Sequence, residues 1–272
     1  MSRRPARSYL YVPGNRPDRF DKACAAGADA VIIDLEDAVP AADKTSARAA
    51  LASWLSPEKS VMVRVNAADT EWFEKDLGAC AAAGVIGVVL PKAEKIDDAV
   101  VSLCRRSGTV LLPLIETAVG MAQVAAVAAT PQVQRRLFGA IDFQLDLGID
   151  GDGDELLTFR SQLVLASRLA GIQSPVDGPC TSWEDTDLLL ADSRRARKLG
   201  FGAKLCIHPK QIPSVNAAFS PSEAEVAWAR KVLDAAKRSG GAAVTVDGRM
   251  VDRPVILKAE RIASEAGLVF SK

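Results

Sequence analysis

Two short apolar runs decide the fold of this chain, Leu111-Leu112-Pro113-Leu114-Ile115-Glu116 and Leu137-Phe138-Gly139-Ala140-Ile141-Asp142. Each run ends in a carboxylate, and about 25 residues separate the two acids, which is the length of one strand, helix and strand repeat. Neighbouring parallel strands would bring Glu116 and Asp142 to the same edge of a sheet. Two such carboxylates suit Mg²⁺, which accepts few protein ligands and keeps water or substrate oxygens. Either acid alone would more readily be a helix cap or a loop charge, and their recurrence favours a metal site.

The same alternation of apolar runs and helix-like segments repeats along the chain. The expected strands cover residues 9–12, 30–33, 61–66, 87–90, 111–116, 137–142, 172–177 and 203–207. The expected helices cover residues 18–26, 41–55, 71–83, 96–106, 118–129, 156–170 and 184–199. Most of the runs are continuously apolar, which is typical of parallel strands buried on both faces. Eight such units predict an α/β fold of the (β/α)8 TIM-barrel type, with a doubly wound open sheet as the alternative.

The pattern changes at Ser222. A helix is expected over residues 223–238, followed by Gly240-Gly241, a hairpin-like stretch over 244–252 and a last helix through Ile262. We interpret residues 222–272 as a C-terminal extension of the barrel formed by residues 1–221, because the extension is too short for a core of its own.

Composition limits the partners of the protein. The 272 residues contain 34 Lys+Arg and 34 Asp+Glu, so the net charge favours neither nucleic acid nor a membrane surface as a partner. The basic run at residues 194–198 is interpreted as a solvated helix face. Five cysteines without a C-x-x-C pair indicate a reducing compartment. The basic start precedes no apolar signal segment, and no run is long enough to span a membrane. We therefore expect a cytoplasmic protein.

Polar residues end nearly every expected strand, namely Asp34, Glu36, Asp37, Arg64, Asn66, Lys92, Glu116, Asp142, Asp177 and His208. In a barrel these residues would gather at the mouth formed by the C-terminal strand ends, where barrel enzymes carry their active sites. The mouth should therefore be a polar, metal-binding pocket for an anion. Arg64 interrupts an apolar strand and needs either an anionic ligand or a structural pairing with Asp34 or Glu36.

Several other chemistries fit the sequence less well. Lys92 could form a Schiff base, but that chemistry rarely accompanies a paired metal site. His208 is the single histidine, which excludes a multi-histidine metal site, and no G-x-S-x-G motif precedes it. We expect His208 either to cap the eighth strand through a hydrogen bond or to contact a ligand. The glycines between Gly148 and Gly153 do not fit a dinucleotide-binding fingerprint.

Eight motifs carry a family resemblance. In order along the chain they are YLYVPGNRP at 9–17, DLEDAV at 34–39, VRVN at 63–66, LPK at 90–92, IET at 115–117, FGAID at 138–142, CIHP at 206–209 and GRMVDRP at 248–254. On these motifs, which span nearly the whole chain, it resembles the citrate lyase beta subunit and the stand-alone malyl-CoA and citramalyl-CoA lyases of the HpcH/HpaI aldolase superfamily. The resemblance implies a (β/α)8 barrel, a Mg²⁺ cofactor, a CoA thioester of a 3-hydroxy acid as substrate, and a homotrimer or hexamer.

The resemblance also implies roles for single residues. Glu116 and Asp142 would bind Mg²⁺, and Glu116 would also contact the substrate. Arg64 would face the substrate and stabilise an enolate. Asp252 would be the acid/base delivered by the C-terminal segment, across a subunit interface in relatives. The residues implied to contact CoA are Tyr11, Arg16 and Lys22, and Ile207 and His208 match a loop that is implied to contact the ligand. Asp34, Glu36 and Asp37 would lie around the metal ligands without binding the metal themselves.

One departure from the family pattern lies beside the metal site. The family commonly has Glu-Asp where this chain has Ile141-Asp142. The missing glutamate removes a charge next to the metal and bears on which acceptor is preferred. Asp146, four residues further on, is the candidate replacement, with a loop salt bridge as the alternative.

The expected function is a stand-alone lyase that cleaves citramalyl-CoA or malyl-CoA to acetyl-CoA and pyruvate or glyoxylate. One alternative is the beta subunit of a citrate lyase that acts on citryl-acyl carrier protein. Another is a metal-dependent pyruvate aldolase or thioesterase on the same barrel. A non-enzymatic binding module fits least, because the positions for the metal and the arginine are filled.

Overall fold

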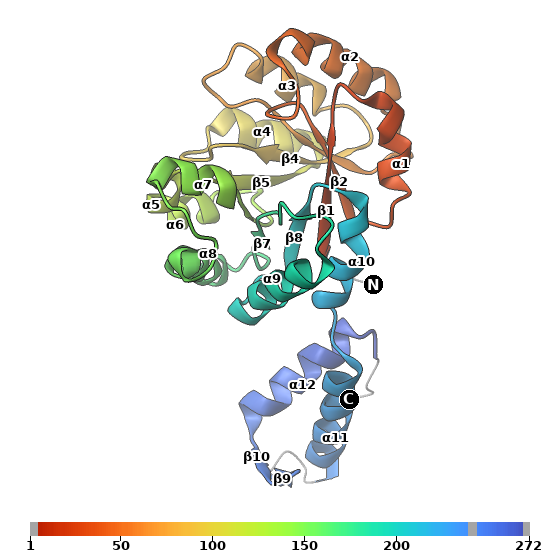
Figure 1. Cartoon of the computed structure of the whole chain (residues 1–272), viewed down its shortest axis with the longest axis vertical. Coiled ribbons are helices and arrows are strands. Elements are labelled where there is room, and N and C mark those ends of the chain that lie inside the picture. The colour runs from red at the N-terminus through yellow and green to blue at the C-terminus, as the bar shows by residue number, and fades with distance from the viewer. Residues whose placement is uncertain (1–4, 239–243, 269–272) are drawn as a thin grey trace. The chain divides into compact units, whose positions relative to one another are not determined.

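The computed structural model describes residues 5–238 and 244–268, which belong to two compact units (Figure 1). The larger unit runs from Pro5 to Asn216, and the smaller one includes the described residues from Ala217 onward. The basic residues at the very start of the chain and the Gly240-Gly241 pair lie outside the described residues.

The larger unit is a closed barrel of eight parallel strands. The strands are β1 (Ser8–Pro13), β2 (Ala30–Asp34), β3 (Val61–Arg64), β4 (Val85–Leu90), β5 (Val110–Ile115), β6 (Leu137–Phe138), β7 (Val176–Asp177) and β8 (Ala203–Cys206). Each strand pairs with the next, and β8 pairs with β1. The predicted (β/α)8 barrel is therefore confirmed, and the open-sheet alternative is wrong.

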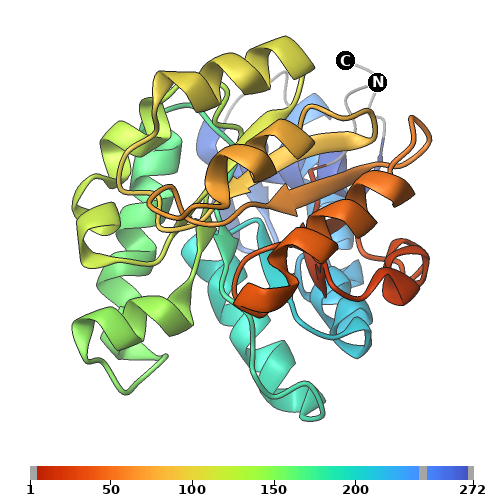
Figure 2. The same cartoon turned by 90° about the horizontal axis from the view of Figure 1, so that it is seen from above.

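Helices alternate with the strands and surround them (Figure 2). The α-helices of this part are α1 (Phe20–Cys24), α2 (Lys44–Trp54), α3 (Phe73–Ala79), α4 (Asp98–Ser107), α5 (Ala118–Ala122), α6 (Val124–Ala129), α7 (Ala140–Leu147), α8 (Leu157–Leu169), α9 (Thr186–Leu199) and α10 (Ile212–Ala218). Short 3₁₀ turns are η1 (Pro17–Arg19), η2 (Ala41–Asp43), η3 (Asp154–Leu156) and η4 (Pro209–Gln211). No helix in the described ranges is long and apolar enough to cross a membrane.

β6 and β7 are much shorter than the sequence predicts. β6 ends at Phe138, and Asp142 lies in the first turn of α7 rather than at a strand end. β7 begins only at Val176, directly after Pro175, which has no N–H to donate to a strand ladder. The helix expected over residues 118–129 is also divided, because α5 and α6 meet at Gln123.

The barrel interior is a continuous apolar core. Its buried members come from all eight strands and include Tyr9, Ile32, Met62, Val89, Leu112, Leu114, Leu137, Val176 and Leu205. Burial of both strand faces explains the continuous apolar runs in the sequence.

Six charged side chains brace the β7–β8 side of the barrel. We call this set the charge ring; its members are Asp152, Arg160, Asp177, Asp192, Arg195 and Lys204. Asp177 lies 3.0 Å from Arg160 Nε and 2.7 Å from Lys204 Nζ, and Lys204 Nζ lies 2.5 Å from Asp192. Arg195 Nη2 joins Asp192 at 2.5 Å and Asp152 at 3.4 Å, and Asp152 returns to Arg160 Nη2 at 2.5 Å. The charges alternate around a closed loop, so each buried ion has two partners of opposite sign.

The charge ring corrects two expectations. Asp177 is fully buried between Arg160 and Lys204 rather than open to the mouth. Burial acts to raise the pKa of Asp177, but the charges of Lys204 and Arg160 outweigh it and hold that pKa below its usual value. Arg195, which we assigned to a solvated helix face, turns into the ring.

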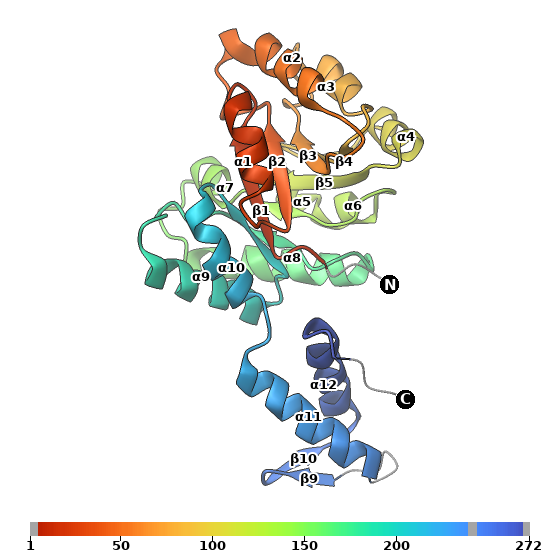
Figure 3. The ribbon, with the colours of Figure 1, turned by 90° about the vertical axis from the view of Figure 1, so that its right-hand side faces the viewer.

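The smaller unit contains α11 (Glu223–Arg238), β9 (Val244–Val246), β10 (Arg249–Val251) and α12 (Arg253–Glu265). α11 and α12 pack side by side, with the antiparallel β9–β10 hairpin between them in sequence (Figure 3). Ala229, Val232, Val251, Ala259 and Ile262 form a buried cluster. The predicted helix, hairpin and helix are confirmed, whereas the expectation that this stretch lacks a core is wrong. That it is part of the barrel domain stays a prediction.

Candidate active site

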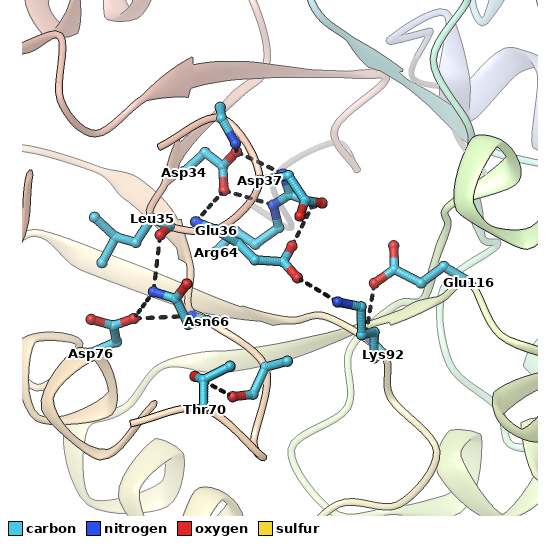
Figure 4. A network of polar contacts seen from close by, with 12 residues as sticks. Asp34, Leu35, Glu36, Asp37, Arg64, Asn66, Thr70, Asp76, Lys92 and Glu116 are labelled. Atoms are coloured by element: carbon cyan, nitrogen blue, oxygen red, sulfur yellow. Dashed lines mark hydrogen bonds and ion pairs between the residues drawn. The ribbon is translucent and has the colours of Figure 1, made fainter. Parts of the chain in front are cut away.

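Charged side chains from four neighbouring strands gather at the mouth of the barrel (Figure 4). We call this set the mouth cluster; its members are Asp34, Glu36, Asp37, Arg64, Lys92, Glu116 and Asp142. Asp34 and Arg64 are the last residues of β2 and β3, and they are register partners across the two strands. Lys92 and Glu116 follow the ends of β4 and β5. The order of the strands therefore brings these residues together.

Arg64 is held by three carboxylates. Its Nε and Nη2 atoms donate to the two oxygens of Asp34 at 2.7 Å and 2.6 Å. Its Nη1 atom lies 2.9 Å from Glu36 and 3.4 Å from Asp37. The Tyr11 ring lies under the guanidinium, 4.9 Å from its carbon atom, in a cation–π arrangement. The structural pairing left open by the sequence is therefore present, and most of the Arg64 donors are occupied.

Asp34 fixes the loop that supports this arginine. Besides Arg64, it accepts hydrogen bonds from the backbone N–H groups of Glu36 at 2.9 Å and Ala38 at 3.1 Å. Lys44 Nζ donates to the carbonyl oxygens of Leu35 and Glu36 in the same loop. The direction of the guanidinium is thus set before any ligand arrives.

Glu116 is a buried carboxylate, and only one of its two oxygens accepts a hydrogen bond from the described residues. Its Oε1 atom accepts from the Lys92 backbone N–H at 2.8 Å, and its Oε2 atom is buried without a hydrogen-bond partner within residues 5–238 and 244–268. Burial, and then the charge of Glu36, raise the pKa of Glu116 from 4.5 to about 8. A Cβ atom at Gly139 would lie 2.5 Å from Glu116 Cβ and 2.6 Å from Oε2, so only glycine leaves room for this side chain.

Asp142 reaches the site from the first turn of α7 and is half-buried. Burial, and then the charge of Asp37, raise its pKa, and its own charge contributes to the raised pKa of Glu116. The two predicted metal ligands therefore act on one another. No group of three or more His, Cys, Asp or Glu in the described ranges could hold a metal. Two carboxylates, one with an unpartnered oxygen, fit a hard cation that completes its shell with water and substrate oxygens.

Lys92 contacts two acids of the mouth cluster, Glu36 through its side chain and Glu116 through its backbone N–H. Its Nζ atom lies 3.5 Å from Glu36 Oε1, while its backbone has a left-handed φ of 46°, uncommon for a residue other than glycine. Burial acts to lower the pKa of the amine, but Glu36, Asp37 and Glu116 raise it overall. A raised pKa disfavours the neutral amine that a Schiff base requires. In the sequence, Lys92 follows an expected strand end, and nothing in its residue type predicts a role in binding.

The residues implied to contact CoA occupy different environments. The Tyr11 side chain packs against the barrel core, and its hydroxyl is buried without a hydrogen-bond partner in the described ranges. Arg16 lies on the surface and pairs with Asp18 at 2.9 Å, and Lys22 is exposed on α1. Their contacts with CoA stay predictions.

His208 caps the 3₁₀ turn η4 after β8. Its Nδ1 atom accepts from the Lys210 backbone N–H at 3.2 Å, and its ring stacks on Trp183 with centroids 4.6 Å apart. The hydrogen-bonded cap is confirmed, at the turn rather than the strand. Ile207 is exposed beside it. Ligand contact by either residue stays a prediction.

Ile141 and Asp146 lie on α7 with Asp142. Ile141 is 47% exposed and lines a cavity of about 520 Å³ together with Cys180, Leu188 and Arg195. The Asp146 carboxylate accepts from the Ala118 backbone N–H at 2.7 Å, at the start of α5. That Asp146 compensates for the missing family glutamate stays a prediction.

Asp252 belongs to the smaller unit. It is the N-cap of α12, where its carboxylate accepts from the Val255 backbone N–H at 3.4 Å. Its catalytic role stays a prediction.

Comparisons with known proteins agree with this geometry. The family model for HpcH/HpaI aldolase/citrate lyase matches residues 7–209. A citrate lyase subunit beta-like protein of Deinococcus radiodurans is 37% identical, over 95% of this chain and 96% of its own length. A (3S)-malyl-CoA thioesterase of Cereibacter sphaeroides is 36% identical, over 96% of both chains. The crystal structure of CitE from Mycobacterium tuberculosis, in complex with magnesium, acetoacetate and coenzyme A, is 37% identical with a TM-score of 0.84, over 96% of this chain and 98% of that one.

Proposed function

Because the chain belongs to the HpcH/HpaI aldolase/citrate lyase family, we propose that it is a Mg²⁺-dependent carbon–carbon lyase. The substrate is a 3-hydroxyacyl-CoA thioester of the citramalyl-CoA or malyl-CoA type, and the products are acetyl-CoA and pyruvate or glyoxylate. The observation that carries the proposal is the Glu116–Asp142 pair, in which a buried carboxylate oxygen has no hydrogen-bond partner among the described residues and lies beside a fixed arginine. Magnesium, a keto acid and CoA in the solved CitE relative support the same reading.

Glu116 and Asp142 would hold the Mg²⁺ ion. When bound, the ion supplies Lewis-acid polarisation of the hydroxyl and carboxylate oxygens of the acyl group. The raised pKa values of both acids mean that binding of the cation is coupled to loss of a proton from this pair.

Arg64 would stabilise the charge that develops on the thioester. The C3 hydroxyl gives up its proton and becomes the carbonyl of the keto acid as the bond between C2 and C3 breaks, and the electron pair of that bond moves onto the thioester oxygen as an enolate. The proton lost by the hydroxyl balances the one that the acetyl carbon gains. Asp34 and Tyr11 already hold the guanidinium in place, so little reorganisation is needed as the charge appears. Asp252 would then protonate the acetyl carbon, or remove that proton in the reverse direction.

The remaining residues would bind the CoA portion. Arg16 and Lys22, which are exposed near the end of β1, would pair with CoA phosphates. Tyr11, Ile207 and His208 would contact the pantetheine and adenine parts.

A thioesterase is the second candidate function, because relatives of 34–36% identity are named (3S)-malyl-CoA thioesterase. The citrate lyase beta subunit is also compatible, since one relative of 34% identity carries that name. The test is to incubate the purified protein and Mg²⁺ with citramalyl-CoA and with malyl-CoA. Acetyl-CoA and a keto acid support the lyase, whereas free CoA and the intact hydroxy acid support the thioesterase. Activity that needs an acyl carrier protein supports the beta subunit, and full turnover with EDTA contradicts the metal mechanism.

We further propose a homotrimer or hexamer in which one subunit supplies Asp252 to the barrel of another. Asp252→Asn should lower cleavage by about 10²-fold or more, the range of general acid–base catalysis, without weakening Mg²⁺ binding. Mixed oligomers of Asp252→Asn and Glu116→Gln subunits should recover part of the activity, because some sites then combine an intact acid/base with an intact metal site. A mixture as inactive as its parents would contradict the shared site.

A further inference from the structure

The mouth cluster contains two cations, Arg64 and Lys92, and they differ in how firmly they are held. Arg64 is buried, and its donors reach Asp34, Glu36 and Asp37 at 2.6–3.4 Å. The Lys92 side chain is 52% exposed, and the carboxylate nearest its amine, Glu36, is 3.5 Å away, at the long end of ion-pair distances. Only Lys92 has both the charge and the freedom to take a new anionic partner.

The backbone places this amine beside the metal pair. With its left-handed φ of 46°, Lys92 donates its backbone N–H to Glu116 Oε1 while its side chain extends to Glu36 (Figure 4). Its positive charge also acts on Asp142. The loop after β4 therefore positions Glu116 and presents a cation at the same place. A non-glycine residue is strained in this conformation, which persists where the surroundings impose it.

We propose that Lys92 Nζ binds the carboxylate of the 2-keto acid portion of the substrate, and that it leaves Glu36 to do so. Glu36 keeps an ion pair when Lys92 leaves, because Arg64 Nη1 stays 2.9 Å from the Oε2 atom of Glu36. A substrate carboxylate in this cluster faces five acidic side chains and needs a cation that is not already saturated. Lys92 meets that need, whereas Arg64 remains directed at the thioester oxygen.

The assignment has a consequence for substrate choice. Recognition through an ion pair makes a free carboxylate on the keto acid a requirement, so the site should reject neutral carbonyl compounds of similar size. This inference rests on the proposed function, since it names the group that holds one of the proposed products.

The test uses the full-length protein saturated with Mg²⁺, with pyruvate and its neutral analogue methyl pyruvate as probes in calorimetric titrations. Lys92→Gln should raise the Kd of pyruvate at least about 30-fold, the range of a charge-assisted hydrogen bond, and leave the Kd of Mg²⁺ within about threefold. Lys92→Arg, which keeps the charge, should retain most of the pyruvate affinity. The matched control is Lys95→Gln, three residues away, because the Lys95 side chain is 84% exposed and pairs with Asp97.

Methyl pyruvate separates charge recognition from a general disturbance of the site. The wild type should prefer pyruvate to methyl pyruvate, and Lys92→Gln should lose that preference. Unchanged pyruvate affinity in Lys92→Gln, or a preserved preference, overturns the inference while leaving the proposed function intact. A wild type that binds neither pyruvate nor glyoxylate with Mg²⁺ present contradicts the proposed function and this inference together.

Discussion

The mouth cluster and the charge ring are both networks of charged side chains with buried members in one barrel, yet they are built in opposite ways. The charge ring alternates three acids with three bases, and its central acid, Asp177, has two cationic partners. The mouth cluster sets five acids against two bases, and Glu116 keeps a buried oxygen without a partner in the described ranges. The charges of the ring hold the pKa of Asp177 low, whereas burial raises the pKa of Glu36 to about 7 and that of Glu116 to about 8.

The comparison separates a structural cluster from a functional one. Both sets have buried members and both are rich in ion pairs, so neither burial nor the number of ion pairs distinguishes them. The difference is the surplus of acidic groups in the mouth cluster, which either bound protons or a bound cation can offset. The following predictions test that distinction, from the largest expected effect to the smallest.

Glu116→Gln should separate function from stability. We expect the rate of cleavage to fall at least about 10³-fold, because loss of a metal ligand removes several kcal/mol of transition-state stabilisation. Stability without metal should stay equal or rise, since burial already favours the neutral form of this acid and the amide that replaces it is neutral as well. Activity assays and thermal unfolding in EDTA measure the two effects, and Glu71→Gln on the surface is the control. A large drop in melting temperature would show that Glu116 has a structural role.

Asp177→Asn should give the opposite result. The substitution leaves Arg160 and Lys204 with one fewer buried anion, so the free energy of unfolding should fall by about 3–5 kcal/mol. Protein that remains folded should keep its Mg²⁺ affinity. Chemical denaturation and Mg²⁺ titration of the folded fraction provide the measurement. If stability is unchanged, the charge ring is not the brace that its geometry indicates.

The two clusters should respond to pH with opposite signs. The pKa of Glu116 is raised from 4.5 to about 8 by burial and Glu36, so its contribution to stability without metal decreases as the pH rises from about 5 to about 8. Burial acts to raise the pKa of Asp177, but Lys204 and Arg160 lower it overall. The contribution of Asp177 to stability is therefore lost only at acidic pH, below the ordinary pKa value of 3.8.

The affinity for Mg²⁺ should also depend on pH, and it should weaken up to tenfold per pH unit below about 8. Calorimetry in buffers of different ionisation enthalpy detects the released proton, and a pH-independent Mg²⁺ affinity would contradict this link.

Ile141→Glu should have the smallest effect. Ile141 is 47% exposed, so stability should change little. A carboxylate beside Asp142 should disfavour the methyl group of a pyruvate product, and the ratio of kcat/KM for citramalyl-CoA over malyl-CoA should fall severalfold. Steady-state assays with both thioesters test this, with Leu145→Glu on the exposed side of α7 as the matched control. Equal ratios in both variants and the wild type would show that Ile141 does not contribute to acceptor preference.

Much of the fold could be predicted because burial on both strand faces leaves a direct trace in the sequence. Runs such as Val61–Arg64 and Val110–Ile115 are continuous because each residue packs against either the barrel interior or a helix. The gathering of Arg64, Lys92 and Glu116 then follows from strand order alone. The sequence predicts Asp142 on a strand because the apolar run continues past Phe138 into α7, where the same residue types are compatible with a helix.

Pairing between side chains could not be read from the sequence in the same way. Asp34 binds Arg64 because β2 and β3 stand in register, and a run of residues carries no register information. The members of the charge ring are spread over residues 152–204, and each one alone resembles an ordinary surface charge. The left-handed backbone at Lys92 likewise follows from its contact with Glu116, not from its residue type.

Gly139 has a consequence for how this protein can change over generations. A Cβ atom there would collide with Glu116, and every amino-acid replacement that a single base change can produce at a glycine codon adds a Cβ atom. No single substitution at this position therefore leaves the Glu116 carboxylate where it is. A descendant that loses glycine here must also move the Glu116 side chain, so the residue at this position marks whether a related sequence can keep the proposed metal site in this form.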